Sequence, residues 1–144
     1  MRYAVWWLWA FAIVLFTTLP LSNFVGHSHW DYVEWVPFRN WVRFPHHRID
    51  LSLDVLANIV LFMPFGYWHP AVKTRRPGTA ILYAVLTAAA FSAAVELYQV
   101  YNHRRTASMT DVSCNVVGAA AGVALALKRQ GVKHRDDRER YAEQ

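Results

Sequence analysis

Two carboxylates and two carboxamides occur at matching spacings in this chain. Asp54 and Asn58 are four residues apart, and so are Asp111 and Asn115. Residues spaced i, i+4 lie on one face of a helix, so each pair forms a polar stripe at the start of an apolar run. Carboxylates inside membrane helices are costly and are usually paired or face water. We interpret the two pairs as parts of one polar site.

A third carboxylate lies in the apolar run between these pairs. Glu96 and Gln99 share one helix face, and the connection that follows carries Arg104 and Arg105. Two acids and an arginine at one depth permit hydrolysis or group transfer, with Glu96 as general base or nucleophile and Asp111 or Asp54 as a second carboxylate. They also permit ligand binding. A third alternative is a structural clasp, in which either arginine pairs with Glu96.

The distribution of charge indicates what positions these residues. The chain has 144 residues, is 55% hydrophobic and carries a net charge of +5, yet long stretches contain no charge at all. A hydrocarbon core of about 30 Å needs roughly 20 residues of helix. We therefore predict an all-α, polytopic membrane domain over residues 1–127 and a basic cytoplasmic tail over residues 128–144. The predicted transmembrane helices are residues 3–21, 53–71, 79–100 and 111–127.

The basic residues predict the orientation. With both termini in the cytoplasm, the inner segments hold ten Lys and Arg residues and the outer segments hold five. Helices 53–71 and 111–127 then both enter from the outer face, so the two helical hairpins are either a parallel repeat or a chance recurrence of one short motif. The sequence does not determine the number of subunits, and a homo-oligomer of the four-helix chain is one alternative.

The predicted outer loop, residues 22–52, is rich in aromatic and basic residues. Such a segment suits the headgroup layer of the membrane, and the alternative is a lid over the polar site. His27, His29, His46 and His47 lie in this loop without regular ligand spacing, so no metal site is predicted. No cofactor and no nucleic-acid partner are expected either.

Several of the polar residues also have a purely structural interpretation. Asp54 and Asp111 could stabilise the first turns of their helices, and Ser108 with Asp111 resembles a capping box. Asn58 and Asn115 could simply bond across helices. Gly118 and Gly122 match a small-xxx-small contact face. Pro64 and Gly66 are expected to kink or loosen the second helix.

The order and spacing of these motifs resemble the VanZ family of small membrane proteins. The motifs cover residues 54–122: Asp54 and Asn58 leading into Leu-Phe-Met-Pro64-Phe-Gly66, then Glu96-Leu-Tyr-Gln99, Arg105, and Asp111-Val-x-x-Asn115-Val-Val-Gly118 with Gly122. The family usually shows one arginine where this chain has Arg104 and Arg105, and Arg105 suits the spacing to Asp111 better.

The resemblance implies a bacterial inner-membrane protein of a family associated with resistance to teicoplanin-type glycopeptides. It supplies no reaction. We therefore expect a site that binds a membrane lipid or a lipid-linked envelope precursor, with an intramembrane hydrolase or transferase and a structural or assembly protein as the alternatives. The expected ligand-binding residues are Asp54, Asn58, Glu96, Gln99, Arg104, Arg105, Asp111 and Asn115.

Overall fold

The computed structural model describes residues 1–103 and 105–142, which are mainly α-helical. These residues form no β-strand, only isolated bridges between Phe24 and Asn102 and between Glu34 and Ser108. The all-α prediction is therefore confirmed. The helices are α1 (Arg2–Thr18), α2 (Arg39–Arg43), α3 (Arg48–Tyr67), α4 (Ala71–Thr74), α5 (Pro77–Gln99) and α6 (Met109–Ala142), with short 3-10 turns at Leu21–Asn23, Trp30–Tyr32 and Pro45–His47.

Three helices are long and apolar enough to cross a membrane: α3, α5 and the Met109–Val132 part of α6. The chain is therefore a multi-pass membrane protein. The fourth apolar helix, α1, has 17 residues and ends at Thr18 rather than at residue 21. It stops there because Leu19 is extended (φ −82°, ψ 149°), as a residue that precedes a proline usually is.

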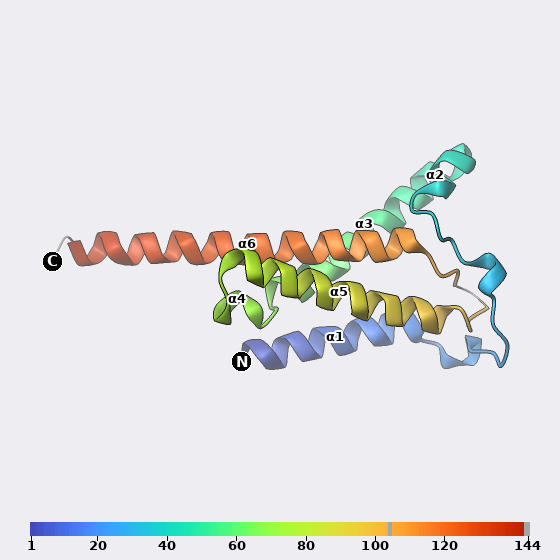
Figure 1. The fold of residues 1–144 in the computed structure, drawn as a ribbon, viewed down its shortest axis with the longest axis horizontal. Coiled ribbons are helices and arrows are strands. Elements are labelled where there is room, and N and C mark those ends of the chain that lie inside the picture. The colour runs from blue at the N-terminus through green and yellow to red at the C-terminus, as the bar shows by residue number, and fades with distance from the viewer. Residues whose placement is uncertain (104, 143–144) are drawn as a thin grey trace.

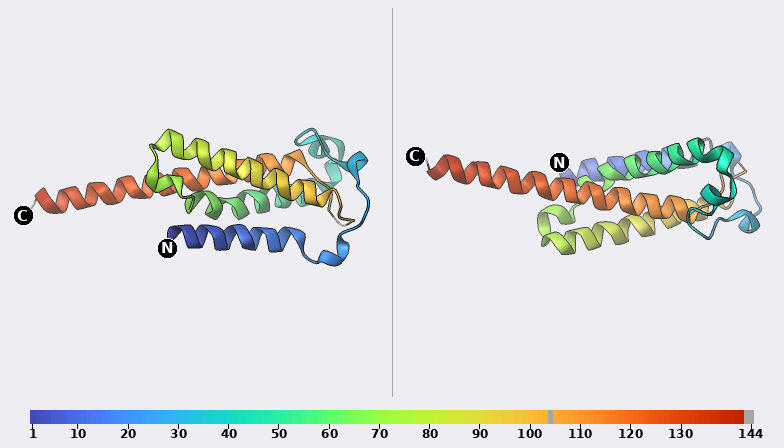
Figure 2. Two further views of the ribbon diagram at one scale, coloured as in Figure 1. Left: turned by 60° about the horizontal axis from the view of Figure 1, so that its bottom comes forward. Right: turned by 90° about the horizontal axis from the view of Figure 1, so that it is seen from above.

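The helices run in two directions (Figure 1). Helices α1 and α5 lead toward one end of the bundle, and α3 and α6 lead back. The N-terminus and α4 lie at the end from which α6 projects, which we call the terminal end (Figures 1 and 2). The opposite end, which we call the loop end, holds the connections after α1 and after α5. Helix α3 begins five residues before the predicted 53, and α1 ends at Thr18, so the predicted outer loop is residues 19–47.

Glycines let α3 and α6 pack at backbone contact. A Cβ atom on Gly118 would lie 2.3 Å from the carbonyl oxygen of Ile59, and one on Gly122 would lie 2.0 Å from that of Met63. A Cβ atom on Gly66 of α3 would lie 1.9 Å from a carbonyl oxygen of α6. Within a membrane, such small residues favour helix association because they allow close van der Waals contact. This contact fixes the two helices that carry the Asp/Asn pairs.

Aromatic residues fill the space between α1 and the other helices. Trp6 and Ile13 of α1 pack in one buried cluster with Phe62 and Phe65 of α3. The indole N–H of Trp9 donates to the carbonyl oxygen of Leu61 at 2.9 Å. The outward faces remain apolar, with exposed side chains that include Trp7, Leu8, Phe11, Phe16, Leu82, Leu86 and Leu97. A lipid environment accounts for this exposure.

Helix α6 does not end at residue 127, where the predicted tail begins. It continues as one helix to Ala142. Lys, Arg, Gln and Glu are favourable helix formers, so leaving the apolar region does not terminate it. At the terminal end, the guanidinium of Arg129 donates to the hydroxyl of Tyr67 at 3.0 Å, and that of Arg2 donates to the carbonyl oxygen of Tyr67. Helix α3 itself is continuous through Pro64.

Candidate functional site

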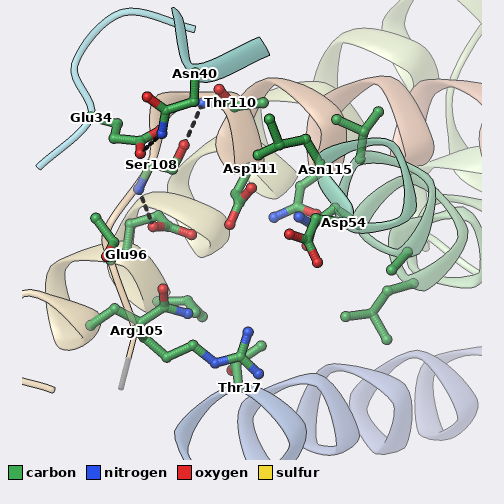
Figure 3. A pocket seen from close by; sticks show the side chains of 18 of the residues that line it. Thr17, Glu34, Asn40, Asp54, Glu96, Arg105, Ser108, Thr110, Asp111 and Asn115 are labelled. Carbon is green, nitrogen blue, oxygen red and sulfur yellow. Dashed lines mark hydrogen bonds between the residues drawn. The ribbon is translucent and has the colours of Figure 1, made fainter. Parts of the chain in front are cut away.

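A cavity of about 310 Å³ lies at the loop end of the bundle, lined by residues of α1, α3, α5, α6 and the outer loop. This volume is within the range of small-ligand sites. The structure brings seven of the eight predicted ligand-binding residues to its wall, several of them shown in Figure 3: Asp54, Asn58, Glu96, Gln99, Arg105, Asp111 and Asn115. Arg104 lies outside the described residues.

Glu96 holds the start of α6. Its side chain is 8% exposed, and its carboxylate accepts a 2.7 Å hydrogen bond from the backbone N–H of Ser108. The Ser108 hydroxyl in turn accepts from the N–H of Thr110 at 3.1 Å. In a capping box, Asp111 would accept from the Ser108 N–H, but Glu96 of α5 makes that bond instead. The first turn of α6 is therefore capped by Ser108, and Glu96 of another helix binds the backbone N–H of that capping residue.

The predicted clasp between Glu96 and Arg105 does not form in the described part of the chain. No ion pair within 4.0 Å joins these two residues. The Arg105 side chain instead extends across the cavity toward Thr17 of α1 (Figure 3). Its guanidinium is thus available to a ligand at the edge of the cavity.

Asp54 and Asp111 face the cavity from α3 and α6 (Figure 3). Neither carboxylate has a hydrogen bond or an ion pair to any residue that the structure describes. Because α3 begins at Arg48, its first-turn acid is Asp50, and Asp54 lies in the second turn. The helix-start interpretation of Asp54 is therefore wrong. Asp111 does lie in the first turn of α6, but without closing a capping box.

Asn115 makes the predicted type of hydrogen bond across helices, from α6 to α5. Its amide nitrogen donates to the Ser92 hydroxyl of α5 at 2.8 Å. Its side-chain oxygen is buried and has no partner within the described residues, although the residue is only 5% exposed. A buried acceptor without a partner is unfavourable unless water or a ligand satisfies it. Asn58 lies half-buried in the same wall.

Part of the outer loop forms another wall of the cavity, and its polar residues Glu34 and Asn40 are not among the predicted site residues. The N–H of Glu34 donates to the carbonyl oxygen of Ala107, and the carbonyl oxygen of Glu34 accepts from the N–H of Met109, both at 2.9 Å. The Phe38 N–H donates to the hydroxyl of Thr110 at 2.8 Å. These bonds tie the loop to the start of α6. The sequence signal that could have indicated Glu34 is its carboxylate within an aromatic-rich segment.

The Glu34 side chain completes this wall. It accepts a hydrogen bond from the side-chain amide of Asn40. Burial raises the pKa of the Glu34 carboxyl above its ordinary range, and a hydrogen bond from the Ser108 side chain partly offsets the rise. Of the described lining residues, Glu34, Asp54, Glu96 and Asp111 are acidic and Arg105 is basic, while Ile13, Leu51, Leu61, Phe62 and Val95 are apolar. The cavity therefore offers both a charged and an apolar surface to a ligand.

The fold and the cavity together define a class: a multi-pass α-helical membrane protein with a cavity at one end of its bundle that is lined by apolar and polar side chains, the charged ones mostly acidic. The chain belongs to the VanZ/LLP1 family, whose model matches residues 4–130. This match confirms the resemblance seen in the motifs of residues 54–122. Comparisons with curated proteins and with solved structures found no match.

Proposed function

We propose that this protein binds the headgroup of an amphipathic envelope molecule, with a lipid-linked precursor as the favoured class. The observation that carries the proposal is the mixed lining of the loop-end cavity. Acids, amides and one arginine surround the same space as apolar side chains of the membrane helices. Small-ligand sites combine an apolar wall with a few convergent polar groups in this way.

The lining suggests a role for each group. Arg105 would hold an anionic group such as a phosphate of the headgroup. Asp54 and Asp111 have no structural partner among the described residues, so they are free to accept hydrogen bonds from hydroxyl or ammonium groups. Trp41, also in the lining, would contact the face of a sugar ring. The apolar part of the ligand would lie against Leu61 and Phe62.

The proposed location is the bacterial inner membrane, with both termini in the cytoplasm. The terminal end of the bundle carries Lys73 in α4, Arg75 and Arg76 directly after it, and Lys128 and Arg129 in α6. Positive residues favour the cytoplasmic face. Helix α1 would be the fourth span, since 17 residues reach about 26 Å and its outward face is apolar. The parallel course of α3 and α6 supports the repeat, which stays a prediction.

The test compares Asp54→Asn with Asp50→Asn. Asp50 is the matched control because it lies one turn earlier on α3, is exposed and does not line the cavity. Wild type and both variants are purified in the same detergent, and their copurifying lipids are identified by mass spectrometry. We expect one lipid class in wild type and Asp50→Asn, reduced at least tenfold in Asp54→Asn at unchanged melting temperature. Identical lipid profiles in all three proteins would refute the proposal.

Catalysis is the second candidate, because Asp54 and Asp111 present two unpartnered carboxylates in one cavity with Arg105. A hydrolase or transferase would use Asp111 or Glu96 as base or nucleophile and Arg105 to stabilise negative charge. The Ser108 bond already occupies one oxygen of Glu96, which favours Asp111. Intact lipid bound to Asp111→Asn, with cleaved lipid in wild type, would establish catalysis over binding.

In the cell, we expect this binding to contribute to tolerance of teicoplanin-type glycopeptides. Expression in a susceptible host without an outer membrane should raise the inhibitory concentration of teicoplanin, and Asp50→Asn should retain the effect. Asp54→Asn should lose it at equal protein level. If the inhibitory concentration for Asp54→Asn instead falls only as far as the amount of protein falls, the structural or assembly role is favoured.

A further inference from the structure

Three histidines from two distant segments meet at the loop end. His27 and His29 lie in the outer loop, and His103 lies in the connection between α5 and α6. Their potential ligand atoms are all within 4.8 Å of one another. The ring centroids are 4.8 Å apart for His27 and His29, 5.0 Å for His29 and His103, and 5.2 Å for His27 and His103. Each ring therefore neighbours the other two.

Backbone hydrogen bonds bring these segments together. The His29 N–H donates to the carbonyl oxygen of Val100 at 2.9 Å, and the His103 N–H donates to that of Asn23 at 3.2 Å. The Val25 N–H donates to the carbonyl oxygen of Tyr101 at 2.9 Å. The main chain thus sets the positions of the three rings independently of any bond between the rings themselves.

His29 is oriented as a metal ligand usually is. Its Nδ1 lies 3.1 Å from the carbonyl oxygen of Val100. A carbonyl only accepts, so this contact assigns the proton to Nδ1 and leaves the lone pair on Nε2. Metal-binding histidines typically donate their second ring N–H to such a backbone carbonyl, which fixes the tautomer and the ring direction. His27 and His103 are exposed, so both rings are free to turn toward the same point.

We propose that His27, His29 and His103 bind a divalent transition-metal ion of the Zn²⁺ type. Imidazole suits Zn²⁺, and three histidines with water in the fourth position form a known tetrahedral arrangement. Zn–N bonds of about 2.0–2.1 Å would put the three nitrogens roughly 3.3 Å apart. Rotating the two exposed rings so that their ligand nitrogens move by about 1–1.5 Å would therefore complete the site. The ion would join the outer loop to the connection that carries Arg105, and the site is distinct from the acidic cavity.

The test is Zn²⁺ binding to the whole protein, purified through a tag without histidine. Isothermal titration with ZnCl₂ compares wild type with His27→Ala and His103→Ala. His46→Ala is the matched control, since His46 lies in the same loop but outside the cluster. The exposed His27 side chain makes no hydrogen bond with the described residues, so His27→Ala should fold even if His103→Ala does not.

We expect about one Zn²⁺ per chain in wild type and His46→Ala, with binding at least tenfold weaker in the two cluster variants. Zn²⁺ should also raise the melting temperature of wild type and His46→Ala but not of the cluster variants. Co²⁺ substitution should give the visible absorption of a tetrahedral site. Absence of Zn²⁺ binding in wild type, or equal binding in His27→Ala and wild type, would overturn the proposal.

Discussion

The carboxylate of Glu96 accepts a 2.7 Å hydrogen bond from the backbone N–H of Ser108. One buried bond thereby joins the last turn of α5 to the start of α6. It also replaces the bond that Asp111 would make in a capping box, so the Asp111 carboxylate remains directed at the cavity (Figure 3). Glu96 thus has a structural role, and in the proposed function it is Asp111 that would face the ligand.

This relationship predicts different effects for two substitutions of Glu96. Glu96→Ala leaves the buried Ser108 N–H without its acceptor, which should lower the free energy of unfolding by about 1–3 kcal/mol. Glu96→Gln keeps an acceptor oxygen and should cost clearly less. Thermal unfolding in one detergent measures both. Equal melting temperatures for the two variants would show that the bond contributes nothing to stability.

The backbone contact between α3 and α6 predicts opposite effects for two glycines of α6. Gly122→Ala places a Cβ atom 2.0 Å from the Met63 carbonyl oxygen, so the helices must separate, at a cost of about 1–3 kcal/mol. A Cβ atom on Gly131 meets nothing within 4 Å, so Gly131→Ala should stabilise the helix by up to about 1 kcal/mol. Melting temperatures that shift in the same direction would contradict this packing.

His69, in the turn between α3 and α4, predicts a loss of stability at acidic pH. Burial lowers the pKa of this imidazole, and the positive charge of Arg2 lowers it further. As the pH falls through about 6.5, the unfolded chain binds a proton that the folded chain does not, so the free energy of unfolding decreases. The decrease should stop below the folded-state pKa.

Melting temperatures of wild type and His69→Asn between pH 8 and pH 5 measure this effect. Asn keeps an acceptor for the Ala71 N–H, which His69 binds at 3.3 Å. The variant should lose less stability on acidification than wild type does. Glu34, whose pKa is raised, acts in the opposite direction, because its protonated form is favoured on folding. Comparing the two proteins cancels that contribution, and identical pH profiles would exclude His69 as the cause.

The proposed orientation predicts which cysteines react from outside the cell. Cys114 is buried at 3% exposure, so it should give little background. Ser28→Cys at the loop end should react with a membrane-impermeant maleimide on intact spheroplasts. Thr74→Cys at the terminal end should react only after permeabilisation. Both positions are exposed, so the reverse pattern would mean that the orientation is inverted.

The sequence was sufficient to predict the four apolar helices and seven of the residues that line the cavity, because helical spacing determines which residues share a face. Asp54 with Asn58 and Asp111 with Asn115 are separated by one turn, and apolar runs place both pairs in packed helices. Hydropathy located the start of α3 less well. Arg48 and Asp50 resemble loop residues by their charge, yet they form the first turn of the helix. That shift changed the interpretation of Asp54.

The outer loop could not be predicted, because its contacts depend on main-chain pairing across about half the chain. Glu34 reaches the cavity through its bonds to Ala107 and Met109. His27 and His29 meet His103 through the paired backbones of their segments. In sequence, His46 and His47 look equivalent to them. The spacing of residues within the outer loop does not indicate which residues of the α5–α6 connection they contact.

Helix α6 is 34 residues long, or about 51 Å, and it begins at the cavity wall and leaves the bundle at the opposite end. The part of α6 beyond the glycine contact, from Gly122 to Ala142, is about 30 Å long, so a tilt of about 5° at that contact would move the far end by about 3 Å. Helix α6 would tilt about its glycine contact with α3, because the two backbones touch there. In the proposed orientation, the position of the basic end of α6 on the cytoplasmic side would thus depend on how the first turn of α6 lies beside Glu96.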